Sequence, residues 1–525
     1  MSLSNASGEL ASALESLAAQ AVSVAAPMAA AALGSTSLGR ERAVLRLLGV
    51  EGIDREGRPL ASEVVDRYIG GDLGRLAGGV ALPFSAALLE YDSTPQALAL
   101  DVAAGAVDLG LEAELLSNAD RRAAAAAHLG RLIDGAMERF DANRTARGEL
   151  LEVLGDRPAP WIGATLRAGI VDPALDEALF LVRAGIDLVG VAVPASRELA
   201  LRLGELGQDV AWRPRPTEAA EDRIPVGSQR GLARLRDALD REAAERGAYV
   251  RLAITPNALA TPEGAVVAGF ERVDLIDLDP LTEIVVTGVD PERSLADFVF
   301  AARLAQRAGV AIHIGAGPLT VAPDLDSGVN SDPATRSGRA LALQLVTVAI
   351  ARRAGIQPDR LLVGALPSWI AGEPQAAARA LAEVALRRVL LPDSPLSFIE
   401  PFDDEATSWP SIIGAVLPGD RVGMVLRRPA EEAWTAEMAR QGRAAAEVAR
   451  QLDAALGPRV LRGVALDHAT AAVESAARLL EQVARDGWPA VTGSVGGGGW
   501  GRMGADSVAP IAEASTSDSL ERALG

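Results

Sequence analysis

The sequence contains neither cysteine nor lysine, and each absence excludes specific chemistry. Without cysteine the chain has no disulfide bond, no thiolate zinc site, no cysteine-ligated iron–sulfur cluster and no cysteine nucleophile. Without lysine it cannot hold pyridoxal phosphate as an internal Schiff base or perform Schiff-base chemistry of its own. A Walker A phosphate loop is also excluded, because that motif requires a lysine. All 51 basic residues are therefore arginines.

Acidic residues outnumber basic ones by 70 to 51, and the formal net charge of the 525 residues is −19. Excess negative charge repels both nucleic-acid phosphates and anionic lipid. The start of the chain lacks a cationic signal segment, and its alanine-rich run at residues 18–33 contains a proline and is shorter than a membrane span requires. We therefore expect a cytoplasmic protein that binds neither nucleic acid nor membrane. The lack of cysteine agrees with a reducing compartment.

The first 150 residues have the pattern of a helical region. Capping residues precede apolar positions at helical spacing within residues 35–49, 93–110 and 117–140, and glycine ends the first two of these stretches.

From about residue 158, β-rich runs alternate with helical stretches. Asp-Pro pairs at 290–291 and 332–333 mark helix starts, because aspartate caps a helix and proline fits its first turn. The amphipathic stretch 231–247 predicts a further helix. Short apolar runs predict strands at residues 161–166, 187–193, 209–212, 249–254, 273–279, 283–288, 310–315, 361–366 and 388–393.

Strands that are apolar on both faces and are each followed by a helix are typical of a parallel sheet. Their number favours an α/β fold of the (β/α)8 TIM-barrel type, with an open doubly wound sheet as the alternative. We expect an N-terminal helical region at residues 1–150 and the barrel at 151–400. A C-terminal helical extension with a glycine-rich tail would then occupy 401–525.

The tail contains "GSVGGGGWGRMGADS" at residues 493–507, which resembles a phosphate-binding loop only in its glycine content. Such a loop follows a strand and opens a helix, whereas these glycines follow a helix and no periodic helix comes after them. We therefore expect a C-terminal loop here and not a phosphate site.

Few side chains indicate chemistry directly. The three histidines, His128, His313 and His468, are too far apart in sequence to form a local metal motif, and we expect no metal site. His313 is the most informative of them, because it lies near the predicted end of a barrel strand, where barrel enzymes place their chemistry. A hydrogen-bonded structural histidine is the alternative for this residue. The residues that perform catalysis are not identifiable from the sequence.

A family resemblance adds to this interpretation. Residues 41–68 ("ERAVLRLLGVEGIDREGRPLASEVVDRY") and 94–109 ("TPQALALDVAAGAVDL") resemble the N-terminal region of the α subunit of lysine 5,6-aminomutase. The similarity continues through residues 235–252 and 269–279. The resemblance implies a barrel with added helices that belongs to a cytoplasmic radical isomerase.

The same resemblance implies two cofactors and a partner. Enzymes of this family use adenosylcobalamin, a cobalt cofactor, together with pyridoxal phosphate. A smaller β subunit carries the cobalamin-binding domain and the lysine that holds pyridoxal phosphate. A large subunit without lysine is therefore compatible with a pyridoxal enzyme that works as a hetero-oligomer.

By this resemblance, three cofactor-facing family positions fall on Asn257, Asp279 and Thr282. Together with His313, they are the four residues that we expect to bind cofactor at the barrel mouth. Of the family residues at these three positions, only the aspartate is retained, because Asn257 replaces a serine and Thr282 replaces a tyrosine that packs on the pyridoxal ring.

Further family positions differ in ways that alter binding. Thr287 and Val193 replace arginines, Gly317 and Pro318 replace an Asp-Asn pair, and a substrate-binding lysine near residue 397 is missing. Loss of a charge-assisted contact costs about 2–3 kcal/mol. We therefore expect a 1,2-amino shift on an amino acid other than lysine.

Two alternatives remain open. The chain could belong to a cobalamin-dependent isomerase that lacks pyridoxal phosphate and acts on a non-amino substrate. It could also be a non-catalytic barrel subunit, since a shared fold does not by itself carry a shared reaction.

Overall fold

A computed structural model gives the fold of most of the chain. It describes residues 8–52, 59–157, 161–166, 168–192, 224, 226–256, 259–282, 284, 289–315, 332–365, 375–399, 424–426, 444, 463–492, 507–512 and 517–524.

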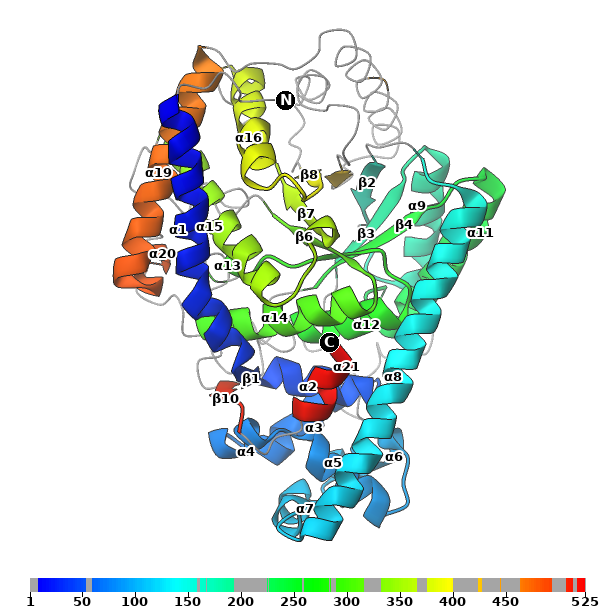
Figure 1. The fold of residues 1–525 in the computed structure, drawn as a ribbon. Helices are drawn as coiled ribbons and strands as arrows, with labels where there is room; N and C mark the ends of the chain where they lie inside the picture. The colour runs from blue at the N-terminus through cyan, green and yellow to red at the C-terminus, as the bar shows by residue number, and fades with distance from the viewer. Residues whose placement is uncertain are drawn as a thin grey trace, which may run out of the picture.

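Eight parallel strands close into a barrel, which confirms the predicted fold class (Figure 1). Each strand pairs with the next along the chain, and the last pairs with both its predecessor and the first, so that no edge is left open. The strands are β2 (Trp161–Thr165), β3 (Leu188–Ala192), β4 (Arg251–Thr255), β5 (Leu275–Asp277), β6 (Ala311–Ile314), β7 (Leu361–Gly364), β8 (Leu396–Ile399) and β9 (Met424–Leu426).

Helices between the strands cover the outside of this barrel. The two Asp-Pro signals are confirmed, because Asp290 accepts a hydrogen bond from the Arg293 N–H and Asp332 accepts from the Ala334 and Thr335 N–H groups at the starts of their helices. The helices are α9 (Val171–Arg183), α11 (Gln229–Arg246), α12 (Thr261–Phe270), α13 (Pro280–Thr282), α14 (Pro291–Arg307), α15 (Pro333–Arg353), η5 (Pro358–Arg360) and α16 (Ala376–Leu390).

The last part of the barrel differs from the sequence-based expectation. The predicted strand at 388–393 is wrong, because α16 continues to Leu390 and the next strand, β8, begins at Leu396. A short apolar run inside a longer helical pattern cannot be told from a strand by periodicity alone. Residues 424–426, for which we expected no strand, form β9, so the barrel extends beyond residue 400. The expected strand at 209–212 lies outside the described residues, and the one at 283–288 lies almost wholly outside them.

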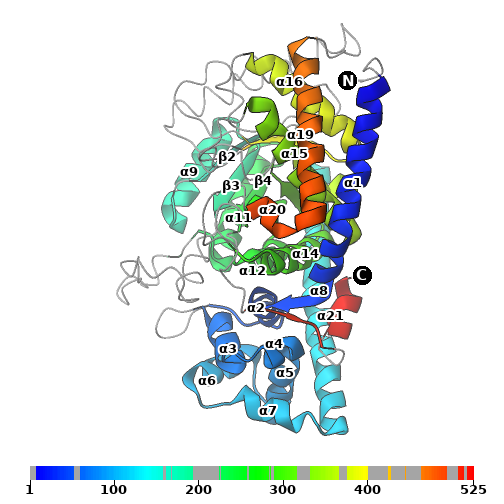
Figure 2. The same cartoon turned by 90° about the vertical axis from the view of Figure 1, so that its left-hand side faces the viewer.

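The N-terminal region is helical as predicted, and its helices pack against the barrel helices α12 and α14 (Figures 1 and 2). Its longest helix, α8, runs for 36 residues from this region up to the barrel helices. Near its end, Arg147 donates hydrogen bonds to the carbonyls of Val273 (2.7 Å) and Ala308 (3.1 Å), which precede β5 and β6. The helices are α2 (Leu38–Leu47), α3 (Leu60–Ile69), α4 (Leu73–Gly78), α5 (Ala81–Glu90), α6 (Pro95–Ala104), α7 (Leu109–Leu115) and α8 (Ala119–Leu154).

The segment that follows the first helix pairs with a segment near the C-terminus outside the barrel. Strand β1 (Ser35–Ser37) pairs antiparallel with β10 (Val508–Pro510), and α21 (Ser517–Leu524) packs on α8. Helix α1 (Gly8–Leu33) lies beside α15 and α19 (Val464–Asp486), and α20 (Trp488–Thr492) follows α19 directly (Figure 2).

Helix α1 corrects one sequence-based expectation. It begins at Gly8, well before the alanine-rich run, and among the described residues it is the one helix that is long and apolar enough to cross a membrane. Length and composition alone are weak evidence for a membrane-spanning helix, because buried core helices satisfy the same criteria. Leu10, Leu14 and Leu17 of α1 are buried against the protein.

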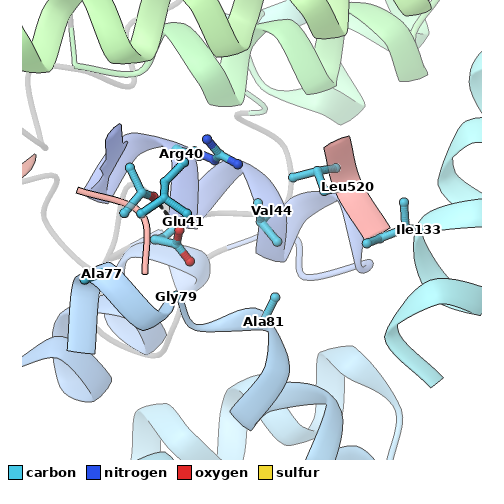
Figure 3. Close-up of a pocket in the computed structure, with 10 residues that line it drawn as sticks. Arg40, Glu41, Val44, Ala77, Gly79, Ala81, Ile133 and Leu520 are labelled. Atoms are coloured by element: carbon cyan, nitrogen blue, oxygen red, sulfur yellow. Dashed lines mark hydrogen bonds between the residues drawn. The ribbon is translucent and has the colours of Figure 1, made fainter. Parts of the chain in front are cut away.

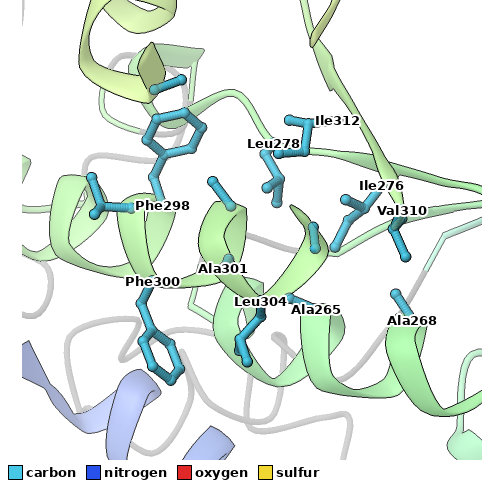
Figure 4. Close-up of a cluster of buried hydrophobic side chains, with 14 of the residues drawn as sticks. Ala265, Ala268, Ile276, Leu278, Phe298, Phe300, Ala301, Leu304, Val310 and Ile312 are labelled. Carbon is cyan, nitrogen blue, oxygen red and sulfur yellow. The ribbon is translucent and has the colours of Figure 1, made fainter. Parts of the chain in front are cut away.

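The main core fills the space between the strands and their helices. Ile276 of β5 and Ile312 of β6 lie on the side of the strands that faces Ala301 of α14 and Ala265 of α12 (Figure 4). Since side chains alternate along a strand, the neighbouring residues of β5 and β6 point to the interior of the barrel.

Helices α15 and α19 approach closely at a glycine. A Cβ atom at Gly338 would lie 2.3 Å from the Ala472 carbonyl oxygen and 2.9 Å from the Ala476 nitrogen, both of which are backbone atoms.

We predict that Gly338→Ala lowers the free energy of unfolding by about 1–3 kcal/mol, because the helices have to separate. Gly135→Ala on α8 is the matched control, since it meets no atom within 4 Å. It should stabilise by up to about 1 kcal/mol. Urea denaturation of both variants measures the difference, and equal stability of Gly338→Ala and the wild type would contradict the close packing.

Candidate functional site

The strand register identifies which residues face the barrel interior. Residues paired across neighbouring parallel strands point to the same side, and every second residue along a strand does so too. The pairs that include Leu188, Ala253 and Leu275 belong to a buried cluster inside the barrel, so Asp277 and His313, which pair with each other, also face inward.

The amino end of the interior is filled by apolar packing. Leu188, Ala253, Leu275 and Leu362 form the cluster, with Trp161 and Ala311 packed against it. The Arg251 guanidinium lies 3.3 Å from the centre of the Trp161 ring and 2.5 Å from an Asp156 carboxylate oxygen. This charge is therefore stacked and paired at the end of the barrel opposite to its carboxyl end.

Toward the carboxyl end, the inward positions are small or polar. Gly190 pairs with Thr165, and Gly364 pairs with Ser397. A Cβ atom at Gly190 would lie 3.0 Å from the Thr165 Oγ1, so glycine allows the threonine hydroxyl to occupy this space. Thr255 at the end of β4 is exposed. The carboxyl half of the barrel thus combines hydroxyl groups with little side-chain volume.

Two titratable groups lie in contact within this half. The Nδ1 atom of His313 is 2.8 Å from a carboxylate oxygen of Asp277. His313 is fully buried, whereas the Asp277 side chain is 26% exposed. An ionised carboxylate only accepts hydrogen bonds, so Nδ1 carries the proton and Nε2 presents its lone pair. Within the described part of the chain, this buried Nε2 atom has no hydrogen-bond partner, and the same is true of the Ser397 hydroxyl.

The four expected cofactor-binding residues can now be placed. His313 lies on β6 and faces the interior, and Asp279 follows β5 as a half-buried residue. Thr282 is the last residue of α13, and its side chain lies outside the described part of the structure. Asn257 is likewise outside it. The structure therefore does not test whether the four side chains converge.

Sequence reasoning missed Asp277. Three aspartates occur in the run 273–279, and the resemblance drew attention to the last of them. Only the pairing register of β5 with β6 shows that Asp277 is level with His313. Among the described residues, no group of three or more histidines and carboxylates is arranged to hold a metal ion.

A buried polar network lies behind the carboxyl ends of β6 and β7. The Gln344 amide on α15 donates hydrogen bonds to the carbonyls of Gly315 (2.5 Å) and Gly364 (2.8 Å). Arg387 on α16 donates from Nε to both the Gln344 Oε1 and the Gly364 carbonyl, each at 2.8 Å. Two side chains therefore set the separation of the strand ends that border the site.

The network continues to the C-terminal helix α19. Arg387 pairs with Glu383 at 2.6 Å, and His468 of α19 lies 2.9 Å from the other oxygen of that carboxylate. Burial raises the pKa of Glu383, but Arg387 and His468 oppose this and hold the pKa below its ordinary value. Helix α19 thus contributes an imidazole group to the network behind the strand ends.

Two cavities lie outside the barrel. The smaller, of about 20 Å³, separates the N-terminal helices from α21 and is bordered by Glu41, Val44 and Leu520 (Figure 3). Glu41 accepts hydrogen bonds from Thr36 and from the Val80 N–H, and burial raises its pKa. This volume holds about one water molecule, so it is a packing feature and not a substrate site. The larger, of about 450 Å³, is an apolar groove between α1, α14 and α19.

The Glu383 carboxylate generates a prediction about stability. Its pKa is lower in the folded state than the ordinary 4.5, so its contribution is complete above about pH 4.5 and is lost as the pH falls through the lowered value. We predict that Glu383→Gln lowers the free energy of unfolding at pH 7 by about 3–5 kcal/mol, because Arg387 stays buried without its partner. This loss should shrink below pH 4.5.

The double variant Glu383→Gln/Arg387→Met is the control, since it leaves no uncompensated guanidinium and should recover part of the stability. Urea denaturation at pH 7 and pH 4 measures all three proteins. An identical pH dependence of the single variant and the wild type would show that the carboxylate does not act through its charge.

The chain is similar in sequence to curated alpha subunits of lysine 5,6-aminomutase. Among curated proteins, the lysine 5,6-aminomutase alpha subunit of Fusobacterium nucleatum is 28% identical over 363 residues, which are 69% of this chain and 65% of that protein. The alpha subunit of Acetoanaerobium sticklandii is 26% identical over 378 residues, which are 70% of this chain and 66% of that protein. The match thus spans slightly less than two thirds of each relative.

Solved structures show a weaker likeness. An octameric ribulose-1,5-bisphosphate carboxylase/oxygenase from Pyrococcus horikoshii is 15% identical with a TM-score of 0.36, covering 64% of this chain and 68% of that one. No functional argument rests on it.

The family comparison is more extensive. Residues 11–405 match the model of a family described as the TIM-barrel domain of the D-lysine 5,6-aminomutase alpha subunit. This range includes the N-terminal helices and all the barrel strands except β9. The resemblance seen in the sequence is therefore confirmed, and the chain belongs to the family of D-lysine 5,6-aminomutase alpha-subunit TIM-barrel domains.

Proposed function

We propose that this chain is the large subunit of an adenosylcobalamin-dependent radical aminomutase that performs a 1,2-amino shift on an amino acid. The observation that carries the proposal is the family match across the N-terminal helices and most of the barrel. The amino half of the barrel is filled by apolar side chains, so the reaction is proposed to occur in the polar carboxyl half, where barrel enzymes place their chemistry.

The described residues would form only part of the cofactor sites, and another subunit would have to supply the rest. Pyridoxal phosphate needs a lysine for its imine and donors for its phosphate, and the chain has no lysine. Arg251, the described arginine that faces the barrel interior, is paired at the opposite end. We therefore propose that a smaller, cobalamin-binding partner subunit supplies the lysine and completes the cofactor sites.

When bound, the two cofactors would supply the organic radical and the stabilisation of the migrating amino group. The barrel itself would enclose the substrate, exclude water and orient it. We propose that His313, Asp279, Thr282 and Asn257 line the mouth on this chain's side. A chain without thiols suits radical chemistry, because a thiol near the radical would quench it.

The substrate is proposed to be an amino acid other than lysine, acted on in the cytoplasm. The support is the set of arginine, tyrosine and lysine positions of the family that carry other residues here, including Thr282 and Thr287. A cobalamin-dependent isomerase without pyridoxal phosphate is the second candidate, favoured by the same losses.

Co-purification from the native lysate tests the proposal. We expect the chain to bring down a smaller, lysine-containing protein, and absorbance spectra of the complex to contain both cobalamin and pyridoxal bands. Mass spectrometry identifies the partner. Cobalamin without pyridoxal would favour the second candidate, whereas a chain that purifies alone and colourless would rule out both and indicate a non-catalytic subunit.

A further inference from the structure

The Nε2 atom of His313 has no role in the proposed function so far. It is buried, faces the barrel interior and has no hydrogen-bond partner among the described residues, while Nδ1 of the same ring is fixed by Asp277 at 2.8 Å. Buried polar atoms are nearly always paired, so an unpaired one that also faces the interior of a barrel is a candidate contact for a ligand. Ser397, whose unpartnered hydroxyl lies in the same half of the barrel, gives a second such atom.

The Asp277 carboxylate determines what Nε2 can do. It accepts the Nδ1 proton, which makes Nε2 the basic nitrogen, and its negative charge stabilises the imidazolium that forms when Nε2 gains a proton. Among the described residues, the ion pair that Asp277 forms is with His313. No described arginine neutralises this charge, and the Asp277 side chain, at the last residue of β5, is 26% exposed.

His468 differs from His313 in the state of its carboxylate partner. His468 pairs with Glu383, but Glu383 is also bound by Arg387, and these three residues lie among α15, α16 and α19 outside the barrel. A carboxylate already paired with a guanidinium stabilises an imidazolium less. His468 is therefore part of the supporting network, and His313 is the histidine placed to meet a ligand.

We propose that His313, held by Asp277, is the proton acceptor for the ammonium group of the substrate. This proposal rests on the proposed function, because an amino acid enters as an ammonium and its nitrogen forms new bonds only after losing a proton. The N–H bond of the ammonium breaks and an Nε2–H bond forms. The electron pair stays on the substrate nitrogen, and Asp277 remains ionised. No oxidant or reductant is needed.

Nuclear magnetic resonance of the full chain tests the recognition step without any cofactor. Labelling with ¹⁵N-histidine gives three imidazole groups, since the chain has three histidines, and His313→Gln assigns the signal. We expect the pattern of an Nδ1–H tautomer. Pentylammonium should shift the His313 Nε2 signal and leave His128 unchanged. Pentyltrimethylammonium, which has the same charge but no N–H, should have no effect. An Nε2–H tautomer, or an equal response to both cations or to neither, would overturn the proposal.

Kinetics of the assembled complex test the chemical step. We expect His313→Gln and Asp277→Asn each to lower kcat by about 10²–10⁴-fold, the usual contribution of acid–base catalysis. The double variant should lose no more than the worse single variant, because the two residues act as a unit. His128→Gln is the matched control, since that histidine contacts Ser85 in the N-terminal helical region. A merely structural role would instead give additive losses that follow the unfolding midpoint.

The two proposals fail in different ways. A complex with no amino-acid turnover, in a chain whose His313 still responds to pentylammonium, removes the aminomutase assignment and keeps the amine site. A complex that turns over with kcat unchanged in His313→Gln keeps the assignment and removes the role of His313.

Discussion

Closure of the barrel is the constraint on which the rest of the molecule depends. β9 has only three residues, yet it pairs with both β8 and β2 and so removes the last open edge. Closure fixes the strand register, and the register decides which side chain of each alternating pair faces the interior. Asp277 and His313 meet because their strands are neighbours in register, although 36 residues separate them in the chain. The same alternation sends Ile276 and Ile312 outward into the main core.

Arginine supplies charged contacts that hold helices to the barrel strands. Arg147 joins the long helix α8 to carbonyls that precede two strands, and Arg387 joins α16 to the end of a third. A guanidinium presents several donors in a rigid plane, so one side chain can satisfy carbonyls and a carboxylate together, which an ammonium group does less well. A chain without lysine is therefore no poorer in anchoring contacts.

The sequence predicts most of the architecture and less of the site. Asp-Pro pairs, alternating strand and helix patterns and helix-ending glycines are local signals, and the helices at Pro291 and Pro333 begin where those signals place them. The late strands were harder, because "RVLLPD" is apolar in a helix as well as in a strand. Of the site, the sequence pointed to His313 through its place at a strand end. Asp277 could not be found in this way, since its partner is set by the pairing of two strands. In the buried network, Glu383 and Arg387 lie four residues apart on one helix, which is a local signal. The contacts with Gln344 and His468 join three helices and leave no such pattern.

The contact between Glu383 and His468 has a consequence for how the protein is made. His468 lies 85 residues beyond its partner, so a ribosome releases the barrel strands before it releases α19. Until then, the carboxylate, the guanidinium and the glutamine that brace the ends of β6 and β7 are present without the helix that covers them. The strands can pair during synthesis, but Glu383 gains its contact with His468 only when α19 has docked. Completion of the network behind the strand ends is therefore a late step in the synthesis of the chain.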